Sequence, residues 1–330
     1  MTNAPYFFDG LPPAGGSDHR PTAAETLREI HAGLASTPKR LPCKLFYDAA
    51  GSRLFEEITT LPEYYPTRTE LCILEAYGRE IASLIGREAV IVEFGSGASR
   101  KTRTLLDALE APRAYVPIDI SSEMLLSSAR SLDLAYPGLE VRPVVGDYMR
   151  PLELPLSPSE KQRGVTAFFP GSTIGNFEQD EAVLFLRRVR RACGNAARLL
   201  IGVDVPKERA LLEAAYDDSA GVTARFNRNV LRVINRDHAA DFRVGAFRHR
   251  AVWNAECSRV EMHLVSERDQ RVRVGSRSYA FRAGEPIVTE HCYKYRPEAF
   301  SELVESAGFG VARVWLDEQR SFSVQLLVPD

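Results

Sequence analysis

The chain has 330 residues, of which 45% are hydrophobic and 26% charged, and its formal net charge is −2. This composition is typical of a globular protein with one large domain or two, and the balanced charge gives no global attraction to nucleic acid. No apolar run approaches the roughly 20 residues of a membrane span, and the N-terminus lacks a basic region followed by an apolar one, so we expect a cytoplasmic protein without a membrane partner.

The N-terminal part of the chain predicts a flexible segment followed by helices. Residues 1–20 are rich in proline and glycine, which is typical of a segment outside a packed core. Thr22 and Glu25 form a Thr-x-x-Glu capping box, which predicts the start of a helix. The same pattern recurs at Thr67 and Glu70, where we expect a longer helix to begin.

Strands and helices alternate between about residues 88 and 205. The predicted strands are 89–94, 114–118, 140–145, 165–169 and 197–203, and the predicted helices are 99–109, 122–134 and 179–193. This alternation predicts right-handed crossovers and therefore a doubly wound parallel sheet. Ligands bind such sheets at the carboxyl ends of the strands, so the residues that follow each strand bear most directly on function.

The pattern changes after residue 205. Two helical segments are followed by five short segments of alternating polarity, which predict an antiparallel meander. The helical segments are 208–216 and 222–234, and the strand segments are 251–253, 260–265, 272–274, 279–281 and 287–292.

The last part of the chain returns to the α/β pattern, with a helix at 297–307 and a terminal antiparallel hairpin around Val314 and Val324. The second region therefore interrupts the first. The predicted division is a flexible N-terminus (1–20), a doubly wound α/β domain (66–205 and 294–330) and a second, α+β domain (21–65 and 206–293).

The turn after the first predicted strand of the α/β domain indicates a nucleotide-type cofactor. Gly95 and Gly97 let the backbone approach a ligand closely, and the next helix directs its free N–H groups at the turn. A dinucleotide loop requires G-x-G-x-x-G, but Arg100 occupies the third glycine position and Glu93 precedes the turn. The pattern favours a ligand without phosphates and with a positive centre, S-adenosylmethionine (SAM).

The next two strand ends carry further polar groups. Asp119 follows the second strand, where a carboxylate can accept both ribose hydroxyls. Asp147 and Tyr148 follow the third, where a carboxylate can accept the adenine amino group and a ring can cover the base. Three aligned strand ends predict SAM binding. A nicotinamide cofactor held by Asp119 is the alternative, and a lone acid at a strand end is otherwise usually a helix cap or a solvated loop residue.

The segment after the fourth strand faces the acceptor in SAM-dependent enzymes. Nucleic-acid amino-methyltransferases usually place there an Asn or Asp, two prolines and an aromatic residue, and that signature is absent. Gly171, Ser172, Thr173 and Asn176 instead offer small polar groups and open backbone, which suit an α-amino-acid zwitterion. A tight turn with Asn176 near a helix cap is the structural alternative.

Several longer motifs resemble the histidine α-N-methyltransferases of ergothioneine biosynthesis. They are Leu61-Pro62-Glu63-Tyr64-Tyr65-Pro66-Thr67-Arg68-Thr69-Glu70, Gly95-Ser96-Gly97 with Lys101-Thr102, Gly171-Ser172-Thr173-Ile174-Gly175-Asn176, Ala215-Tyr216-Asp217-Asp218 and Glu261-Met262-His263-Leu264. The resemblance runs from about Lys39 to the C-terminus. It implies a class I SAM-methyltransferase fold with a split second domain that binds substrate, and the conversion of L-histidine to its trimethylated betaine, hercynine, with three molecules of SAM.

The same resemblance implies roles for individual residues. The amino and carboxylate groups of the substrate would be held by Tyr64, Asn176 and Tyr216, with Gly171 and Thr223 nearby; Tyr47 would lie close to the imidazole, and Phe55 and Met262 would form apolar walls. The cofactor shell would contain Gly95, Gly97, Lys101, Asp119, Asp147 and Tyr148, the last at a position where phenylalanine is common. We predict that Tyr47, Tyr64 and Asn176 are the catalytic residues.

The residues that would contact the imidazole are Glu290 and Cys292. Known family members have serine at the second position, and a thiol is a weaker hydrogen-bonding group than a hydroxyl. On a strand these two side chains share a face while His291 points away, which argues against a metal site formed by the three. The five scattered cysteines also lack a C-x-x-C pair, so we expect neither a metal nor a disulfide framework.

Because Cys292 replaces the serine of known family members, the sequence leaves the identity of the substrate partly open. The first alternatives are that the enzyme methylates a different free amino acid or a histidine derivative, or that it methylates an imidazole nitrogen. The further alternatives are a nucleic-acid or protein methyltransferase and a SAM-binding protein without catalysis. We expect a small-molecule amino acid as the partner, no nucleic acid, and a monomer.

Overall fold

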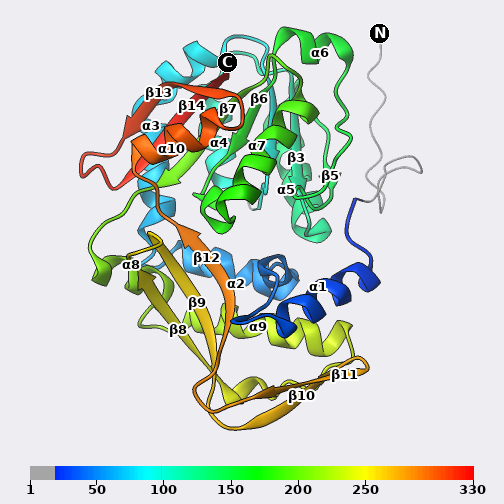
Figure 1. Ribbon diagram of the computed structural model, residues 1–330. Coiled ribbons are helices and arrows are strands. Elements are labelled where there is room, and N and C mark those ends of the chain that lie inside the picture. The colour runs from blue at the N-terminus through cyan, green and yellow to red at the C-terminus, as the bar shows by residue number, and fades with distance from the viewer. Residues whose placement is uncertain (1–18, 98) are drawn as a thin grey trace.

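The computed structural model describes residues 19–97 and 99–330 of the chain (Figure 1). The predicted flexible N-terminus therefore falls almost wholly outside the described residues. The first described helix, α1 (Ala23–Ala35), begins at the predicted capping box. The Thr22 hydroxyl accepts the N–H of Glu25 at 3.2 Å, and the Glu25 carboxylate accepts the N–H of Thr22 at 2.8 Å.

The larger sheet has eight strands and is doubly wound. Its strands are β2 (Val90–Phe94), β3 (Ala114–Asp119), β4 (Glu140–Val141), β5 (Val144–Val145), β6 (Thr166–Phe169), β7 (Arg198–Asp204), β13 (Phe309–Leu316) and β14 (Phe322–Pro329). The order is β13-β14-β7-β6-β2-β3-β4, and β5 also pairs with β3. The strands from β7 to β4 are parallel, whereas β14 runs antiparallel to β7 and to β13. The predicted parallel sheet and terminal hairpin are thus confirmed.

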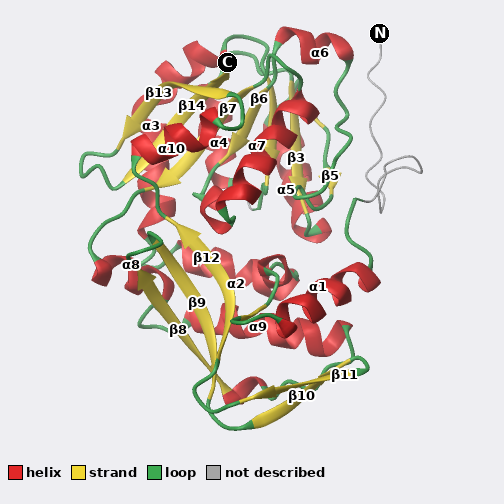
Figure 2. Ribbon diagram, viewed as in Figure 1, coloured by secondary structure: helices red, strands yellow, loops and turns green. Residues whose placement is uncertain are grey.

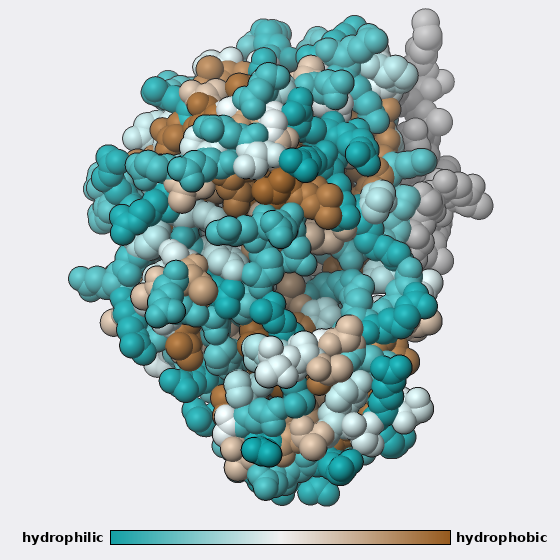
Figure 3. All heavy atoms as spheres, viewed as in Figure 1, coloured by the Kyte–Doolittle hydropathy of each residue, from teal (hydrophilic) through white to brown (hydrophobic). Residues whose placement is uncertain are grey.

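Helices cover both faces of this sheet (Figure 1). They are α3 (Tyr65–Ile85), α4 (Arg100–Ala108) and α5 (Ser122–Ala135) in one layer and α7 (Gln179–Cys193) and α10 (Pro297–Glu305) in the other, with α6 (Pro158–Arg163) at the end of the sheet. Apolar side chains of α3 and α4, such as Ile73 and Leu105, pack on one face, and those of α7 and α10, such as Phe185 and Phe300, on the other. The face in Figure 3 is largely hydrophilic, with a group of apolar atoms near its centre. Leu184 of α7 is one of the exposed large apolar residues.

The second sheet has four strands in the order β1-β12-β9-β8. Its strands are β1 (Lys39–Arg40), β8 (Phe247–Asn254), β9 (Arg259–Ser266) and β12 (Pro286–Tyr293); its helices are α1, α2 (Ala49–Thr59), α8 (Arg209–Tyr216) and α9 (Val222–Asp237), with short 3₁₀ turns η1 (Cys43–Phe46) and η3 (Val244–Ala246). Phe226 of α9 packs with Met262 and Ile287 of the sheet in a separate apolar core. Figure 2 shows this helix and sheet region below the larger sheet. The predicted domain boundaries stay a prediction.

Three sequence predictions about local structure are wrong. The predicted strand 140–145 is split into β4 and β5, because Pro143 between them has no N–H to donate to a ladder. The predicted meander is not continuous, because β12 pairs directly with β9, and β10 (Gln270–Val274) with β11 (Arg277–Phe281) forms a separate hairpin. Helix α3 begins at Tyr65 rather than at a Thr67–Glu70 capping box.

Candidate active site

Two cavities adjoin where the carboxyl ends of β2, β3 and β6 face helix α2. We call them the strand-end cavity and the inter-sheet cavity. The strand-end cavity is lined by residues that include Gly95, Ser96, Gly97, Lys101, Asp119 and Tyr148, and the inter-sheet cavity by residues that include Asn176, Tyr216, Thr223, Met262, Glu290 and Cys292. Both cavities are lined by Tyr47, Phe55, Tyr64, Gly171 and Thr173, so these five residues form their junction.

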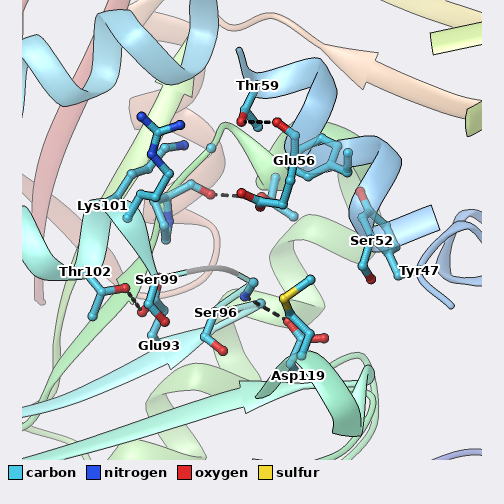
Figure 4. A pocket seen from close by; sticks show the side chains of 18 of the residues that line it. Tyr47, Ser52, Glu56, Thr59, Glu93, Ser96, Ser99, Lys101, Thr102 and Asp119 are labelled. Carbon is cyan, nitrogen blue, oxygen red and sulfur yellow. Dashed lines mark hydrogen bonds between the residues drawn. The ribbon is translucent and has the colours of Figure 1, made fainter. Parts of the chain in front are cut away.

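The glycine turn of the strand-end cavity has the backbone that the sequence predicts. Gly95 and Gly97 have φ angles of +76° and +47°, which side chains other than glycine adopt rarely. Asp119 at the end of β3 accepts the N–H of Gly97 at 3.0 Å and that of Ser121 at 2.8 Å. Burial raises the pKa of Asp119 against these backbone bonds. Asp119 lies at one end of the cavity, opposite Glu56 of α2 and Lys101 of α4 (Figure 4).

The sequence suggested that Glu93 offers a negative charge to a positively charged ligand, but the structure does not support this role. Its carboxyl group accepts the hydroxyls of Thr102 at 2.6 Å and Tyr115 at 2.5 Å, and it is 2% exposed. Burial raises the pKa of Glu93 to about 8, so it is mostly neutral at pH 7. Its role is to tie the first turn of α4 to strand β3.

The structure brings Tyr148 to the strand-end cavity but not Asp147. The Asp147 carboxylate pairs with Lys44 at 3.0 Å and accepts the N–H of Met149 at 2.9 Å, and the cavity lining does not include it. The ion pair between Asp147 and Lys44 would therefore have to rearrange before Asp147 could contact an adenine amino group as predicted. Tyr148 packs against Phe169 and Phe185, which fixes its ring beside the glycine turn.

Glu70 has a role that the capping-box prediction missed. Its side chain is fully buried, pairs with Lys101 at 2.6 Å and accepts the N–H of Gly171 at 2.8 Å. A Cβ at Gly202 would lie only 2.0 Å from Glu70, so glycine there leaves room for the carboxylate. Glu70 thus joins α3, α4 and the loop after β6 at the junction of the two cavities.

The inter-sheet cavity collects every residue that the family resemblance assigned to the substrate. These are Tyr47, Phe55, Tyr64, Gly171, Asn176, Tyr216, Thr223, Met262, Glu290 and Cys292. Asn176 comes from the 3₁₀ turn η2 (Thr173–Asn176), and its amide donates to Glu290 at 3.0 Å. The Cys292 sulfur lies 3.4 Å from the Asn176 oxygen and 3.5 Å from Glu290. Asn176, which we expect to hold the amino and carboxylate groups, is therefore hydrogen-bonded to Glu290, which we expect to contact the imidazole.

Strand alternation holds over residues 290–292 of β12, beyond the register shift between Val288 and Glu290, because His291 faces away from the cavity and its Nδ1 lies 2.8 Å from Glu178. Glu290, His291 and Cys292 therefore do not converge. More generally, no group of three His, Cys, Asp or Glu side chains in the described part of the chain is placed to hold a metal ion. Among residues 19–97 and 99–330, no helix is long and apolar enough to cross a membrane.

Burial sets the protonation of the inter-sheet cavity. It raises the pKa of Glu290 to about 7, against the opposing effects of Cys292 and Lys294. It also raises the pKa values of Tyr47, Tyr64 and Tyr216 well above 10, so these phenols keep their protons. The hydroxyl of Thr223 is buried and has no hydrogen-bond partner among the described residues. The cavity therefore offers several hydroxyl donors and one carboxyl group close to half ionised at neutral pH.

Sequence reasoning missed several polar residues at or behind the cavities. Glu56 lines the strand-end cavity, and Asp204 and Lys294 lie buried behind the inter-sheet cavity. Lys294 was open to prediction, because strand alternation places it on the same side as Glu290 and Cys292. Glu70 gave a weaker signal, because an acid inside an amphipathic helix is usually solvated.

Comparison with known proteins agrees with this geometry. Residues 26–329 match the family described as "Histidine-specific methyltransferase, SAM-dependent". A histidine N-alpha-methyltransferase of Mycobacterium tuberculosis is 44% identical over 306 residues, which is 91% of this chain and 93% of that protein. The protein of the same name from Mycolicibacterium smegmatis is 43% identical over 313 residues, 93% of this chain and 96% of that one.

A fungal relative extends the comparison. Ergothioneine biosynthesis protein 1 of Neurospora crassa is 32% identical over 288 residues, which is 84% of this chain but 32% of that longer protein. The similarity thus covers the helices and strands of both sheets, including the segments that line the two cavities. This chain belongs to the family of histidine-specific, SAM-dependent methyltransferases.

Proposed function

We propose that this enzyme transfers three methyl groups from SAM to the α-nitrogen of L-histidine and so forms hercynine, the betaine of the ergothioneine pathway. The observation that carries the proposal is the junction of the two cavities. Tyr47, Tyr64, Gly171 and Thr173 line both, so a group held in one cavity reaches a group held in the other. The names of the two mycobacterial relatives support histidine as the substrate.

The strand-end cavity fits SAM in three respects. The Asp119 carboxylate at one end can accept ribose hydroxyls while it keeps its backbone bonds. A Cβ at Gly97 would meet no atom within 4 Å among the described residues beyond its chain neighbours, so the turn borders open space on that side. The hydroxyls of Ser96 and Ser99 are buried without a partner among the described residues, which leaves them for a polar ligand.

The inter-sheet cavity fits an amino acid with a hydrogen-bonding side chain. In the proposal Asn176, Tyr64 and Tyr216 bind the amino and carboxylate groups, and Glu290 accepts an imidazole N–H. Phe55 and Met262 supply apolar walls. The hydrogen bond between Asn176 and Glu290 keeps both side chains oriented before the substrate enters.

The mechanism requires an unprotonated amine about 3–3.5 Å from the methyl group and in line with it. SAM supplies that methyl group on a positively charged sulfonium. Tyr64 and Asn176 orient the amine and Tyr47 lies near the imidazole, and both tyrosines act as neutral hydroxyls because burial holds their pKa values high. A tyrosinate base is therefore disfavoured, and the proposal leaves removal of the ammonium proton to water.

Repeated methylation requires space at the junction. Gly171 has a φ of +87°, and a Cβ there would lie 3.3 Å from Thr173 and 3.4 Å from Lys101. A glycine at this position therefore widens the passage through which the growing methylammonium group must turn. Glu70 fixes the loop by accepting the Gly171 N–H.

The proposal includes a monomer that acts on a free amino acid in the cytoplasm and not on nucleic acid. All five cysteines are free thiols, which supports a reducing compartment. The exposed large apolar side chains among the described residues come from four different helices, which supports a monomer; they are Tyr77, Leu84, Leu134, Leu184 and Leu211. Light scattering of the purified protein tests the oligomeric state.

The function is tested by incubation of the purified protein with SAM and separate acceptors, followed by mass spectrometry. The panel contains L-histidine, other free amino acids, a histidine-containing peptide and an oligonucleotide. The proposal predicts up to three added methyl groups on histidine and little modification of the other acceptors. Methylation of the peptide or oligonucleotide in preference to histidine would overturn it.

A further inference from the structure

A buried cluster of charges lies behind the inter-sheet cavity and has no part in the site described so far. It consists of Asp204, Lys207 and Lys294, and we call it the Asp204 cluster; Lys294 is the member whose charge also acts on Glu290. The Asp204 carboxylate is fully buried and pairs with Lys207 at 2.5 Å and with Lys294 at 2.8 Å. Burial alone would raise the pKa of Asp204, but the two ammonium groups outweigh it and lower that pKa.

The cluster has one positive charge in excess, because two ammonium groups share one carboxylate. Both carboxylate oxygens are already in use, since Asp204 also accepts the N–H of Val205 at 2.9 Å and the hydroxyl of Tyr65 at 2.6 Å. The Lys207 side chain is 12% exposed, whereas that of Lys294 is 1% exposed. Lys294 is paired with Asp204 and also acts on the charge of Glu290, and Asp317 acts on Lys207. Because the three groups of the cluster together carry one surplus positive charge in a buried place, the cluster favours an anion in the adjoining cavity.

Lys294 reaches the cavity through Tyr216. Its ammonium group donates to the Tyr216 hydroxyl at 2.8 Å and lies 4.8 Å from the centre of the ring. Because this bond uses a lone pair of the hydroxyl oxygen, the hydroxyl proton is left to point away from the lysine. The neighbouring charge also makes the phenol a stronger donor. Tyr216 lines the inter-sheet cavity next to Cys292, so the charge of Lys294 polarises a hydroxyl donor in the wall of that cavity.

Glu290 lines the same cavity as Tyr216. Glu290 is acidic and lies beside Asn176 and Cys292, Cys292 also contacts Tyr216, and Lys294 follows directly after β12 on the same side as Glu290 and Cys292. The cavity therefore contains both an acceptor, Glu290, and a positively polarised donor, Tyr216. An amino acid bound there can give a side-chain N–H to Glu290 and an anionic group to Tyr216.

We propose that Lys294 is a positioning residue that, through Tyr216, makes the enzyme select acceptors with a free α-carboxylate. This inference rests on the proposed function and deepens it, because it states which chemical class of histidine derivative the site accepts. Histidine fits, whereas histidinamide, with a neutral group in place of the carboxylate, does not compensate the charge of the Asp204 cluster.

The test compares histidine with histidinamide in the wild type and in Lys294→Met. We expect the wild type to prefer histidine in kcat/KM by about 100-fold, from loss of a charge-assisted bond and exposure of an unpaired charge. In Lys294→Met this preference should fall about tenfold or more, mainly through a higher KM for histidine. Lys207→Met is the comparison variant: it also removes one ammonium partner of Asp204 but leaves the hydrogen bond from Lys294 to Tyr216, so it should reduce the preference by less than Lys294→Met does.

Further variants separate positioning from loss of fold. Tyr216→Phe should also reduce the preference, and its combination with Lys294→Met should cause little further loss, because both act on one contact. Lys294→Gln, which keeps a donor for Tyr216 but not the charge, should be intermediate and replaces Lys294→Met if that variant does not fold. Calorimetric binding of SAM reports whether each variant retains its strand-end cavity.

The outcomes distinguish this inference from the proposed function. If the wild type methylates neither histidine nor histidinamide, the proposed function fails. If the wild type methylates both equally well, or if folded Lys294→Met and Lys294→Gln keep the full preference for histidine, the role of Lys294 is wrong while the function stands.

Discussion

The strand-end and inter-sheet cavities adjoin, but they are built in different ways. The strand-end cavity takes its glycine turn and Asp119 from consecutive strand ends of one parallel sheet, where backbone hydrogen bonds fix them, and helices α2, α3 and α4 supply further polar groups. The inter-sheet cavity draws on helices, a 3₁₀ turn and two strands of the other sheet, β9 and β12, and buried side chains such as Asn176 and Glu290 hold it together. Cofactor binding therefore depends on local backbone geometry, and substrate selection on distant side chains.

This difference predicts that single substitutions separate the two functions. Substitutions at the strand ends should weaken SAM binding and leave amino-acid selectivity unchanged. Substitutions on β12 should change amino-acid selectivity and leave SAM binding unchanged. The junction residues are the exception, because Glu70 and Gly171 contact elements of both cavities.

The largest expected effect is on SAM binding in Asp119→Ala. Loss of two hydroxyl acceptors should weaken the affinity by roughly 2–4 kcal/mol if both bonds are buried. Isothermal titration calorimetry measures this, and Asp133→Ala, an exposed acid on α5, is the matched control. Unchanged affinity in a folded Asp119→Ala protein would show that the ribose is bound elsewhere.

A second effect concerns stability and pH. The pKa of Glu290 is about 7 in the folded protein, against a usual value of 4.5. Between these values the unfolded chain holds fewer protons than the folded one, so the free energy of unfolding falls as pH rises. The contribution is fully present below pH 4.5 and is lost above pH 7, a change of about 3 kcal/mol.

Glu290→Gln should remove this dependence. Its stability relative to the wild type should be roughly 2–3 kcal/mol more favourable at pH 8 than at pH 5, as measured by urea unfolding at both pH values. Glu93, whose raised pKa lies in a similar range, is present in both proteins and cancels in the difference. A difference independent of pH would mean that Glu290 has an ordinary pKa.

The third prediction concerns selectivity. Glu290→Ala should lower kcat/KM for histidine by an amount that corresponds to roughly 1.5–3 kcal/mol of lost transition-state stabilisation, because a hydrogen bond to the imidazole is lost. The kcat/KM for leucine should change much less. His291→Ala controls for damage to the strand, because that side chain faces Glu178 instead. Equal losses for histidine and leucine would show that Glu290 does not contact the side chain of the substrate.

The smallest expected effect is that of Cys292→Ser. A hydroxyl forms stronger hydrogen bonds than a thiol, and the sulfur already lies near Asn176 and Glu290. We expect histidine methylation to be kept or improved, by less than about 1 kcal/mol in kcat/KM. Loss of activity with the fold intact would indicate that the pocket is built for a different side chain.

The sequence predicted the doubly wound sheet and the glycine turn because both follow from local periodicity. The same reasoning misjudged Glu93 and Glu70. Burial raises the pKa of Glu93, and it brings Glu70 to Lys101 and the loop after β6; in both cases the packing of distant elements sets the burial. The residues of the inter-sheet cavity were accessible through family resemblance rather than through spacing. Alternation along β12 would also have indicated Lys294, had the pattern been followed two residues beyond Cys292.

The central claim is that the α-nitrogen of histidine meets the methyl donor at the junction of the two cavities. The most direct test uses SAM with a deuterated methyl group and L-histidine, followed by tandem mass spectrometry of the product. We predict a trimethylated product that loses all of its label as trimethylamine, because every methyl group is on the α-nitrogen. Label retained on the imidazole ring would contradict this account.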